Sequence, residues 1–221
     1  MPIISQELRA LPVIVLADIG GNMAHDSKID ALNQAMRKMI ATFRDNNLRN
    51  AQIKLAVIGF SGSDARLQLP FTLPEHVDWE DLEASGATPM GAAFTLLTAL
   101  IEDREAIKAR DFRPIVILIS DGQPTDDWQD PLDALNQSER AQKADRFALA
   151  IGKGASTEVI KQFVERARGH KEARGAILEA ADADQILKAF KVITMSVSER
   201  YLSSSQPDLS LSGENRLELG L

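Results

Sequence analysis

Short apolar runs alternate with amphipathic segments along most of this 221-residue chain, and few folds accommodate that alternation. Residues 13–17 and 114–120 are apolar almost throughout, which is typical of strands covered on both faces. Residues 28–44 instead repeat apolar side chains at helical spacing. Strands that alternate with helices predict a mostly parallel sheet with helices on both faces. We therefore expect a doubly wound α/β fold.

The remaining elements follow from the same patterns. Further strands are expected at residues 52–60, 66–69, 146–151 and 176–179, and further helices at residues 89–109, 132–143, 156–167 and 184–200. Residues 66–69 follow a Ser-Gly-Ser-Asp turn, so they are expected to form one antiparallel edge strand. A single domain is predicted over residues 1–202, followed by a flexible, Ser-rich tail over residues 203–221.

Composition excludes several function classes. The formal net charge of −7 argues against broad binding to nucleic acid or to anionic membranes. Without any cysteine, the chain has no disulfide, no cysteine-based zinc site and no cysteine nucleophile. No apolar run approaches the roughly 20 residues that a membrane-spanning helix needs. A cytoplasmic location is the simplest expectation.

Polar side chains stand where the predicted strands and helices meet. Asp18 and Asn22 follow the first strand, Thr88 precedes a helix, and Asp121 follows the strand at residues 114–120. Ligands of open α/β sheets bind at the carboxyl ends of the strands. Carboxylate, hydroxyl and carboxamide groups offer hard oxygen donors, which suit Mg²⁺, Mn²⁺ or Ca²⁺ better than Zn²⁺. The sequence thus predicts a divalent-cation site, with Mg²⁺ as the first choice.

Three motifs in this order resemble the von Willebrand factor A domain, in particular its small bacterial branch similar to the tellurite-resistance protein TerY. They are Asp-Ile-Gly-Gly-Asn at residues 18–22, Gly-Ala-Thr-Pro at 86–89 and Ile-Ser-Asp-Gly at 119–122. Asp18, Thr88 and Asp121 match the aspartates and threonine of the family's metal-ion-dependent adhesion site. Gly20 and Asn22 stand where that site has two serines.

The resemblance implies a non-catalytic protein-interaction module. The metal ligands would be Asp18, Asn22, Thr88 and Asp121, and a partner's acidic side chain would complete the coordination of the ion. TerY-like proteins further suggest a stress-response or defence system with kinase and phosphatase partners. Since Gly20 has no side chain, water would have to replace one of the two serine ligands.

Three other interpretations are open. The Asp-Ile-Gly-Gly segment at residues 18–21 also resembles the phosphate loop of actin-like and sugar-kinase ATPases. Alternatively, Asn22 and Thr88 hydrogen-bond the loops of a metal-independent scaffold. An enzyme with Asp18 as nucleophile lacks an obvious acid or oxyanion-stabilising lysine, because Lys28 reads as an ordinary surface residue.

Other residues give weaker signals. The three histidines, His25, His76 and His170, show no metal-ligand spacing. Trp79 and Trp128 fit either rim anchors for a protein partner or caps on the edge of the core. The Asp-Asp pair at residues 126–127 reads as a solvated turn.

Overall fold

A six-stranded sheet forms the centre of the protein, with the strands in the order β3-β2-β1-β4-β5-β6. The strands are β1 (Arg9–Asp18), β2 (Ala51–Ser61), β3 (Asp64–Thr72), β4 (Ile115–Ser120), β5 (Asp145–Ile151) and β6 (Gly175–Ala180). All neighbouring pairs are parallel except β2 and β3, which confirms the single antiparallel edge strand. The structure, a computed structural model, describes residues 8–45, 51–121, 123–152, 158–167 and 175–204.

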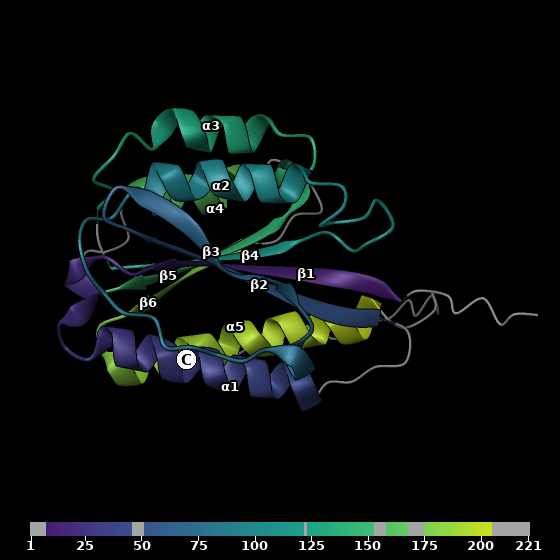
Figure 1. Cartoon of the computed structure of the whole chain (residues 1–221), viewed down its shortest axis with the longest axis horizontal. Helices are drawn as coiled ribbons and strands as arrows, with labels where there is room; N and C mark the ends of the chain where they lie inside the picture. The colour runs from purple at the N-terminus through teal and green to yellow at the C-terminus, as the bar shows by residue number, and fades with distance from the viewer. Residues whose placement is uncertain (1–7, 46–50, 122, 153–157, 168–174, 205–221) are drawn as a thin grey trace, which may run out of the picture.

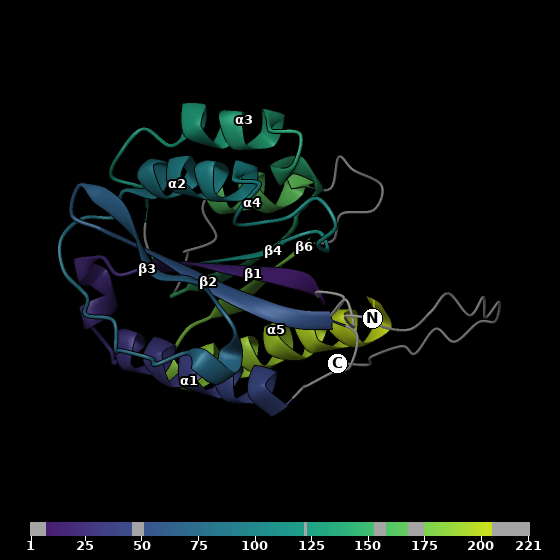
Figure 2. The ribbon, with the colours of Figure 1, turned by 45° about the vertical axis from the view of Figure 1, so that its right-hand side comes forward.

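Helices cover both faces of this sheet (Figure 1). Helices α1 (Lys28–Asp45) and α5 (Ala183–Ser204) lie on one face, and α2 (Met90–Glu102) and α4 (Glu158–Ala167) lie on the other. Helix α3 (Gln129–Gln137) packs on the outside of α2, an arrangement that a second view repeats (Figure 2). The predicted doubly wound α/β fold is confirmed.

The apolar strand β1 divides two hydrophobic cores. Val13 and Val15 belong to the core under α1 and α5, whereas Ile14 and Leu16 belong to the core under α2 and α4. Both faces of β1 are therefore covered, which explains why its sequence shows no alternation of apolar and polar residues.

The strand order reverses between β1 and β4, and we call the space outside the carboxyl ends of these two strands the crevice. The connection through α1 crosses one face and places β2 on one side of β1, while β4 lies on the other side. The carboxyl ends of β1 and β4 thus meet where the strand order reverses, which is the usual ligand site of open α/β sheets. Asp18 is the last residue of β1, and Asp121 follows the last residue of β4.

Two predicted helices end early. Helix α2 ends at Glu102 because the Asp103 carboxylate accepts hydrogen bonds from the N–H groups of Glu105 (2.8 Å) and Ala106 (3.2 Å). Helix α3 ends at Gln137, and a separate 3₁₀ turn, η3 (Ala141–Lys143), follows after an extended Ser138. The prediction of continuous helices over residues 89–109 and 132–143 was wrong at these ends.

The predicted boundary between a domain over residues 1–202 and a tail over residues 203–221 stays a prediction. Helix α5 continues through Ser204, two residues into the segment predicted as a tail. Residues 205–221 lie outside the described part of the chain. No helix among the described residues is long and apolar enough to cross a membrane.

Candidate functional site

Asp18 ends β1 beside the crevice, and its side chain is fully buried. Its Oδ2 accepts a hydrogen bond from the Ser120 hydroxyl (2.6 Å), and its Oδ1 accepts one from the Gly20 N–H (2.8 Å). The Thr88 hydroxyl approaches the same Oδ1 at 3.5 Å. The structure therefore brings Asp18 and Thr88 together as predicted.

The surroundings of Asp18 favour its neutral form. The pKa of Asp18 is raised from its ordinary value of 3.8 to about 6, chiefly because the side chain is buried, and the negative charge of Asp121 acts in the same direction. Hydrogen bonds from Ser120 and Gly20 act in the opposite direction, because they stabilise the carboxylate. A positive charge in the crevice would offset the cost of burying this carboxylate.

Thr88 is held by the loop that follows β4. Its N–H donates to the Thr125 hydroxyl (3.0 Å), and the Thr125 N–H donates to the Thr88 carbonyl (2.9 Å). Asp126 accepts hydrogen bonds from the N–H groups of Gly91 (3.0 Å) and Ala92 (2.9 Å) at the start of α2. The interpretation of Asp126 as a solvated turn was wrong, since its carboxylate fastens the Thr88 loop to the Asp121 loop.

Asp121 forms an ion pair with Lys28. The Lys28 Nζ lies 2.7 Å from Asp121 Oδ2, and only 1% of the Asp121 side chain is exposed. The other oxygen, Oδ1, is buried and has no hydrogen-bond partner in the described part of the chain. A buried carboxylate oxygen without a partner is costly, so this atom indicates a missing ligand.

The two positions that depart from the serine pattern behave differently. A Cβ atom added to Gly20 would lie 2.6 Å from Thr88 Oγ1 and 3.0 Å from Asp18 Oδ1. The Thr88 hydroxyl therefore fills the space that a side chain at residue 20 would need. Asn22 lies exposed at the rim, in the 3₁₀ turn η1 (Gly21–Ala24), and its carbonyl accepts from the His25 N–H (3.3 Å). Among the predicted ligands, Asn22 alone is exposed.

Sequence reasoning missed two residues of the site. Ser120 is a buried polar residue at the end of an otherwise apolar strand, and that position was a usable signal. Lys28 was interpreted as a surface lysine, which the ion pair with Asp121 contradicts. Nothing in the local sequence shows that the first residue of α1 turns toward a loop 93 residues away.

The backbone of the glycine loop argues against the phosphate-loop alternative. The Gly20 N–H donates to Asp18 Oδ1, and the Gly21 N–H donates to the Gly86 carbonyl (2.8 Å). A phosphate would need these amide groups free. They instead connect the first loop to Asp18 and to the loop that carries Thr88.

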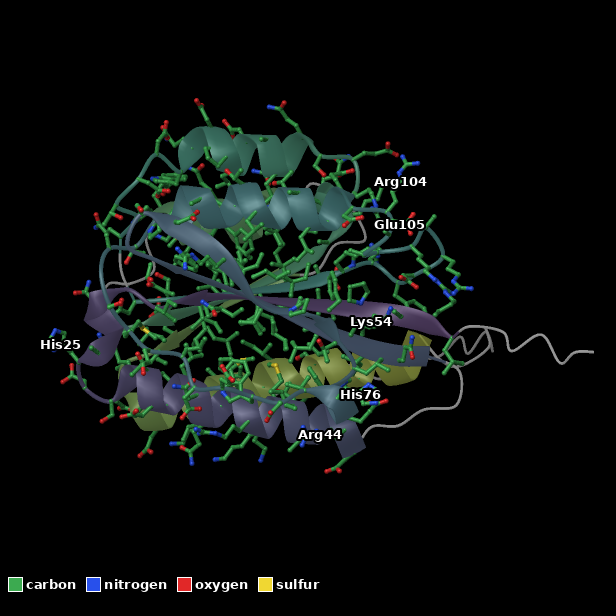
Figure 3. The ribbon with its side chains drawn as sticks, viewed as in Figure 1. His25, Arg44, Lys54, His76, Arg104 and Glu105 are labelled. Carbon is green, nitrogen blue, oxygen red and sulfur yellow. The ribbon has the colours of Figure 1, made fainter. Side chains whose placement is uncertain are left out.

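Of the histidines in the described part of the chain, neither His25 nor His76 contributes a side chain to the site. Figure 3 shows His25 pointing away from the protein and His76, in the turn η2 (Pro74–His76), toward the opposite end of the sheet. His170 lies outside the described residues.

The tryptophans lie at the edges of the cores. Trp79 is partly buried against the core under α1 and α5, and Trp128 against the core under α2 and α4. These positions support the interpretation of both residues as caps on the core.

The chemistry of the donors fits a divalent cation. Two carboxylates, the Thr88 hydroxyl and the Asn22 carboxamide are hard oxygen donors, and Asp121 Oδ1 is available to an ion. In the described ranges no group of three or more histidine, aspartate or glutamate side chains gathers around one point. Water and an external ligand would therefore complete the coordination.

Comparison with known proteins agrees with this architecture. The profile of the family described as "von Willebrand factor type A domain" matches residues 13–123, which include β1, the Thr88 loop and Asp121. A relative, the uncharacterised protein Rv2850c of Mycobacterium tuberculosis, is 32% identical over 116 residues. The match covers 51% of this chain and only 18% of that protein.

Solved structures share the fold at low identity. Proximal thread matrix protein 1 of the mussel byssus, in a structure with a zinc-occupied MIDAS motif, has a TM-score of 0.65 at 18% identity, covering 85% of this chain and 48% of that one. The ArnB paralog VWA2 of Sulfolobus acidocaldarius has a TM-score of 0.58 at 14% identity, covering 87% and 45%. The chain thus spans less than half the length of either protein. With half of its residues matched by the profile and its fold shared with these structures, the chain belongs to the von Willebrand factor type A domain family.

Proposed function

We propose that this chain is a non-catalytic protein-interaction module whose crevice binds a divalent cation and an acidic side chain of a protein partner. Asp18, Thr88 and Asp121 are the central ligands, and Asn22 reaches the ion from the rim. Mg²⁺ is the proposed ion, with Mn²⁺ and Ca²⁺ as alternatives, because all the donors are oxygens. When bound, the ion would supply an open coordination position for the partner's carboxylate.

One observation is the main support for the proposed binding of a divalent cation. Asp121 Oδ1 is buried without a partner in the described structure, in the same crevice as the buried carboxylate of Asp18. Two neighbouring carboxylates repel each other, so the crevice favours a multivalent cation. The zinc-occupied motif in the mussel protein supports a metal at this place in the fold.

The burial of Asp18 supports a binding role over a catalytic one. Its side chain is fully buried, and both of its oxygens accept hydrogen bonds. A carboxylate nucleophile must reach the reacting atom of a substrate, whereas no part of Asp18 is exposed. We therefore propose that no reaction takes place in this crevice.

The biological setting is a further part of the proposal. The motif resemblance supports a TerY-like module in a cytoplasmic stress-response or defence system, with kinase or phosphatase proteins among its partners. The absence of cysteine is compatible with the cytoplasm. Pull-down from the source cells with and without EDTA would test this setting, and metal-independent partners would refute the proposed mode of binding.

Calorimetry tests the metal site directly. We expect Mg²⁺, Mn²⁺ or Ca²⁺ to bind the wild type with one-to-one stoichiometry and Asp121→Asn to lose that binding. Asp78→Asn is the matched control, because Asp78 is an exposed aspartate in the loop after β3. A wild type without any binding heat or thermal shift would leave the metal-independent scaffold as the better account.

A further inference from the structure

Lys28 occupies an electrostatically unfavourable position. It is the first residue of α1, an 18-residue helix, and the N-terminus of a helix carries a partial positive charge. A lysine is disfavoured there, whereas an aspartate or glutamate is favoured. Its side chain nevertheless turns inward to Asp121 Oδ2, with only 17% of its surface exposed.

The turn before α1 also departs from ordinary backbone geometry. Asp26 and Ser27 both have φ angles of +56°, the left-handed region that residues other than glycine rarely adopt. The Lys28 N–H then donates to the His25 carbonyl (3.2 Å), which fixes where the helix begins. The charge at the start of α1 and the backbone conformation before it are therefore both unfavourable, at the point where the Lys28 side chain turns toward the crevice. Unfavourable local features of this kind concentrate at functional sites.

We infer that Lys28 is a tethered cation that neutralises Asp121 until a divalent cation displaces its ammonium group. This inference rests on the proposed function, because it concerns how the same site is regulated. The ammonium donates to Asp121 Oδ2 (2.7 Å) and to the main-chain carbonyl of Asn22 (3.5 Å), so it lies between two of the four residues assigned to the ion. A divalent cation on the neighbouring Oδ1 would lie close to this ammonium group, and because the two positive charges repel each other, binding of the cation favours displacement of the ammonium.

The consequence is a site with two mutually exclusive states. In one state the ammonium group pairs with Asp121, and in the other a divalent cation takes that place. Only molecules in which the ammonium group has left Asp121 can bind the ion. The apparent affinity for the ion is therefore reduced in proportion to the fraction of such molecules. Loss of the ammonium group should therefore tighten cation binding by about tenfold or more, which corresponds to an ion pair of about 1.4 kcal/mol.

Manganese binding measured by electron paramagnetic resonance tests this displacement. Lys28→Met should tighten Mn²⁺ binding by about tenfold, whereas Lys28→Arg keeps the charge and should bind about as the wild type does. Lys38→Met is the matched control: Lys38 is an exposed lysine on the same helix, so its loss changes the net charge equally and should leave the affinity unchanged.

Amine labelling followed by mass spectrometry gives a readout on the unaltered protein. Lys28 should react slowly with an amine reagent in EDTA and several-fold faster in saturating Mn²⁺, while the reactivity of Lys38 stays constant. This inference would be overturned if the labelling rate of Lys28 does not change with Mn²⁺ and Lys28→Met binds Mn²⁺ with the wild-type affinity. The proposed metal site would not be affected by that result. Absence of Mn²⁺ binding in the wild type and in every variant would overturn both.

Discussion

The buried carboxylate of Asp18 predicts how stability depends on pH in the metal-free protein. Its pKa is 3.8 ordinarily and about 6 in the folded chain, because burial penalises the charged form. Between these values the folded state binds more protons than the unfolded state, so the free energy of unfolding falls as pH rises. A shift of about two units corresponds to about 3 kcal/mol over the whole titration, of which about 2 kcal/mol is lost between pH 4 and pH 7.

Replacement of Asp18 by asparagine removes this titration while it keeps the shape of the side chain. The difference in the free energy of unfolding between Asp18→Asn and the wild type should shift by about 2 kcal/mol in favour of the variant from pH 4 to pH 7.5. This change with pH is the informative quantity, because any constant cost of altered hydrogen bonds cancels.

Urea denaturation followed by circular dichroism, in EDTA and at several pH values, measures the difference in the free energy of unfolding between the variant and the wild type. Asp78→Asn, at an exposed loop position, should show a change with pH of less than about 0.5 kcal/mol. If the difference in the free energy of unfolding between Asp18→Asn and the wild type stays constant across this range, the raised pKa of the buried Asp18 carboxylate is refuted. Added Mn²⁺ should stabilise the wild type more than the variant, since only the wild type keeps the negative charge of the Asp18 carboxylate.

Three further substitutions test the geometry of the crevice. Gly20→Ser restores a hydroxyl, but its Cβ would lie 2.6 Å from Thr88 Oγ1. We therefore expect the variant to lose about 1–3 kcal/mol of stability and to gain no Mn²⁺ affinity. Tighter Mn²⁺ binding in calorimetry would contradict this. Thr125→Val removes the hydroxyl that accepts a hydrogen bond from the Thr88 N–H. The variant should lose about 1 kcal/mol of stability and bind Mn²⁺ more weakly. An unchanged Mn²⁺ affinity would show that the Thr88 loop does not need this hydrogen bond. Asp126→Ala removes the carboxylate at the start of α2 and should cost about 1–2 kcal/mol in urea denaturation, whereas a neutral result would refute its capping role.

The fold was predictable because its strongest signals are local. Continuous apolar runs mark β1 and β4 as strands covered on both faces, and helical spacing marks α1 between β1 and β2. The helix ends were less predictable: Asp103 and Ser138 end α2 and α3 through turn geometry that apolar spacing does not encode.

The site residues that follow the ends of strands could be predicted from the sequence. The contacts between residues of different loops could not. Asp18 and Asp121 follow buried strands, so their proximity follows from parallel pairing of β1 with β4. The pairing of Lys28 with Asp121 depends on the turn at Asp26 and Ser27, whose backbone conformation the sequence does not specify. The crowding of Gly20 by Thr88 likewise depends on the approach of two distant loops.

Anomalous diffraction from crystals grown with MnCl₂ tests the divalent-cation site most directly, because it locates the ion itself. We predict a manganese peak in the crevice beside Asp121 and Thr88, with the Lys28 ammonium moved away from Asp121. Crystals that show no such peak at saturating manganese, with Lys28 still paired to Asp121, would contradict it.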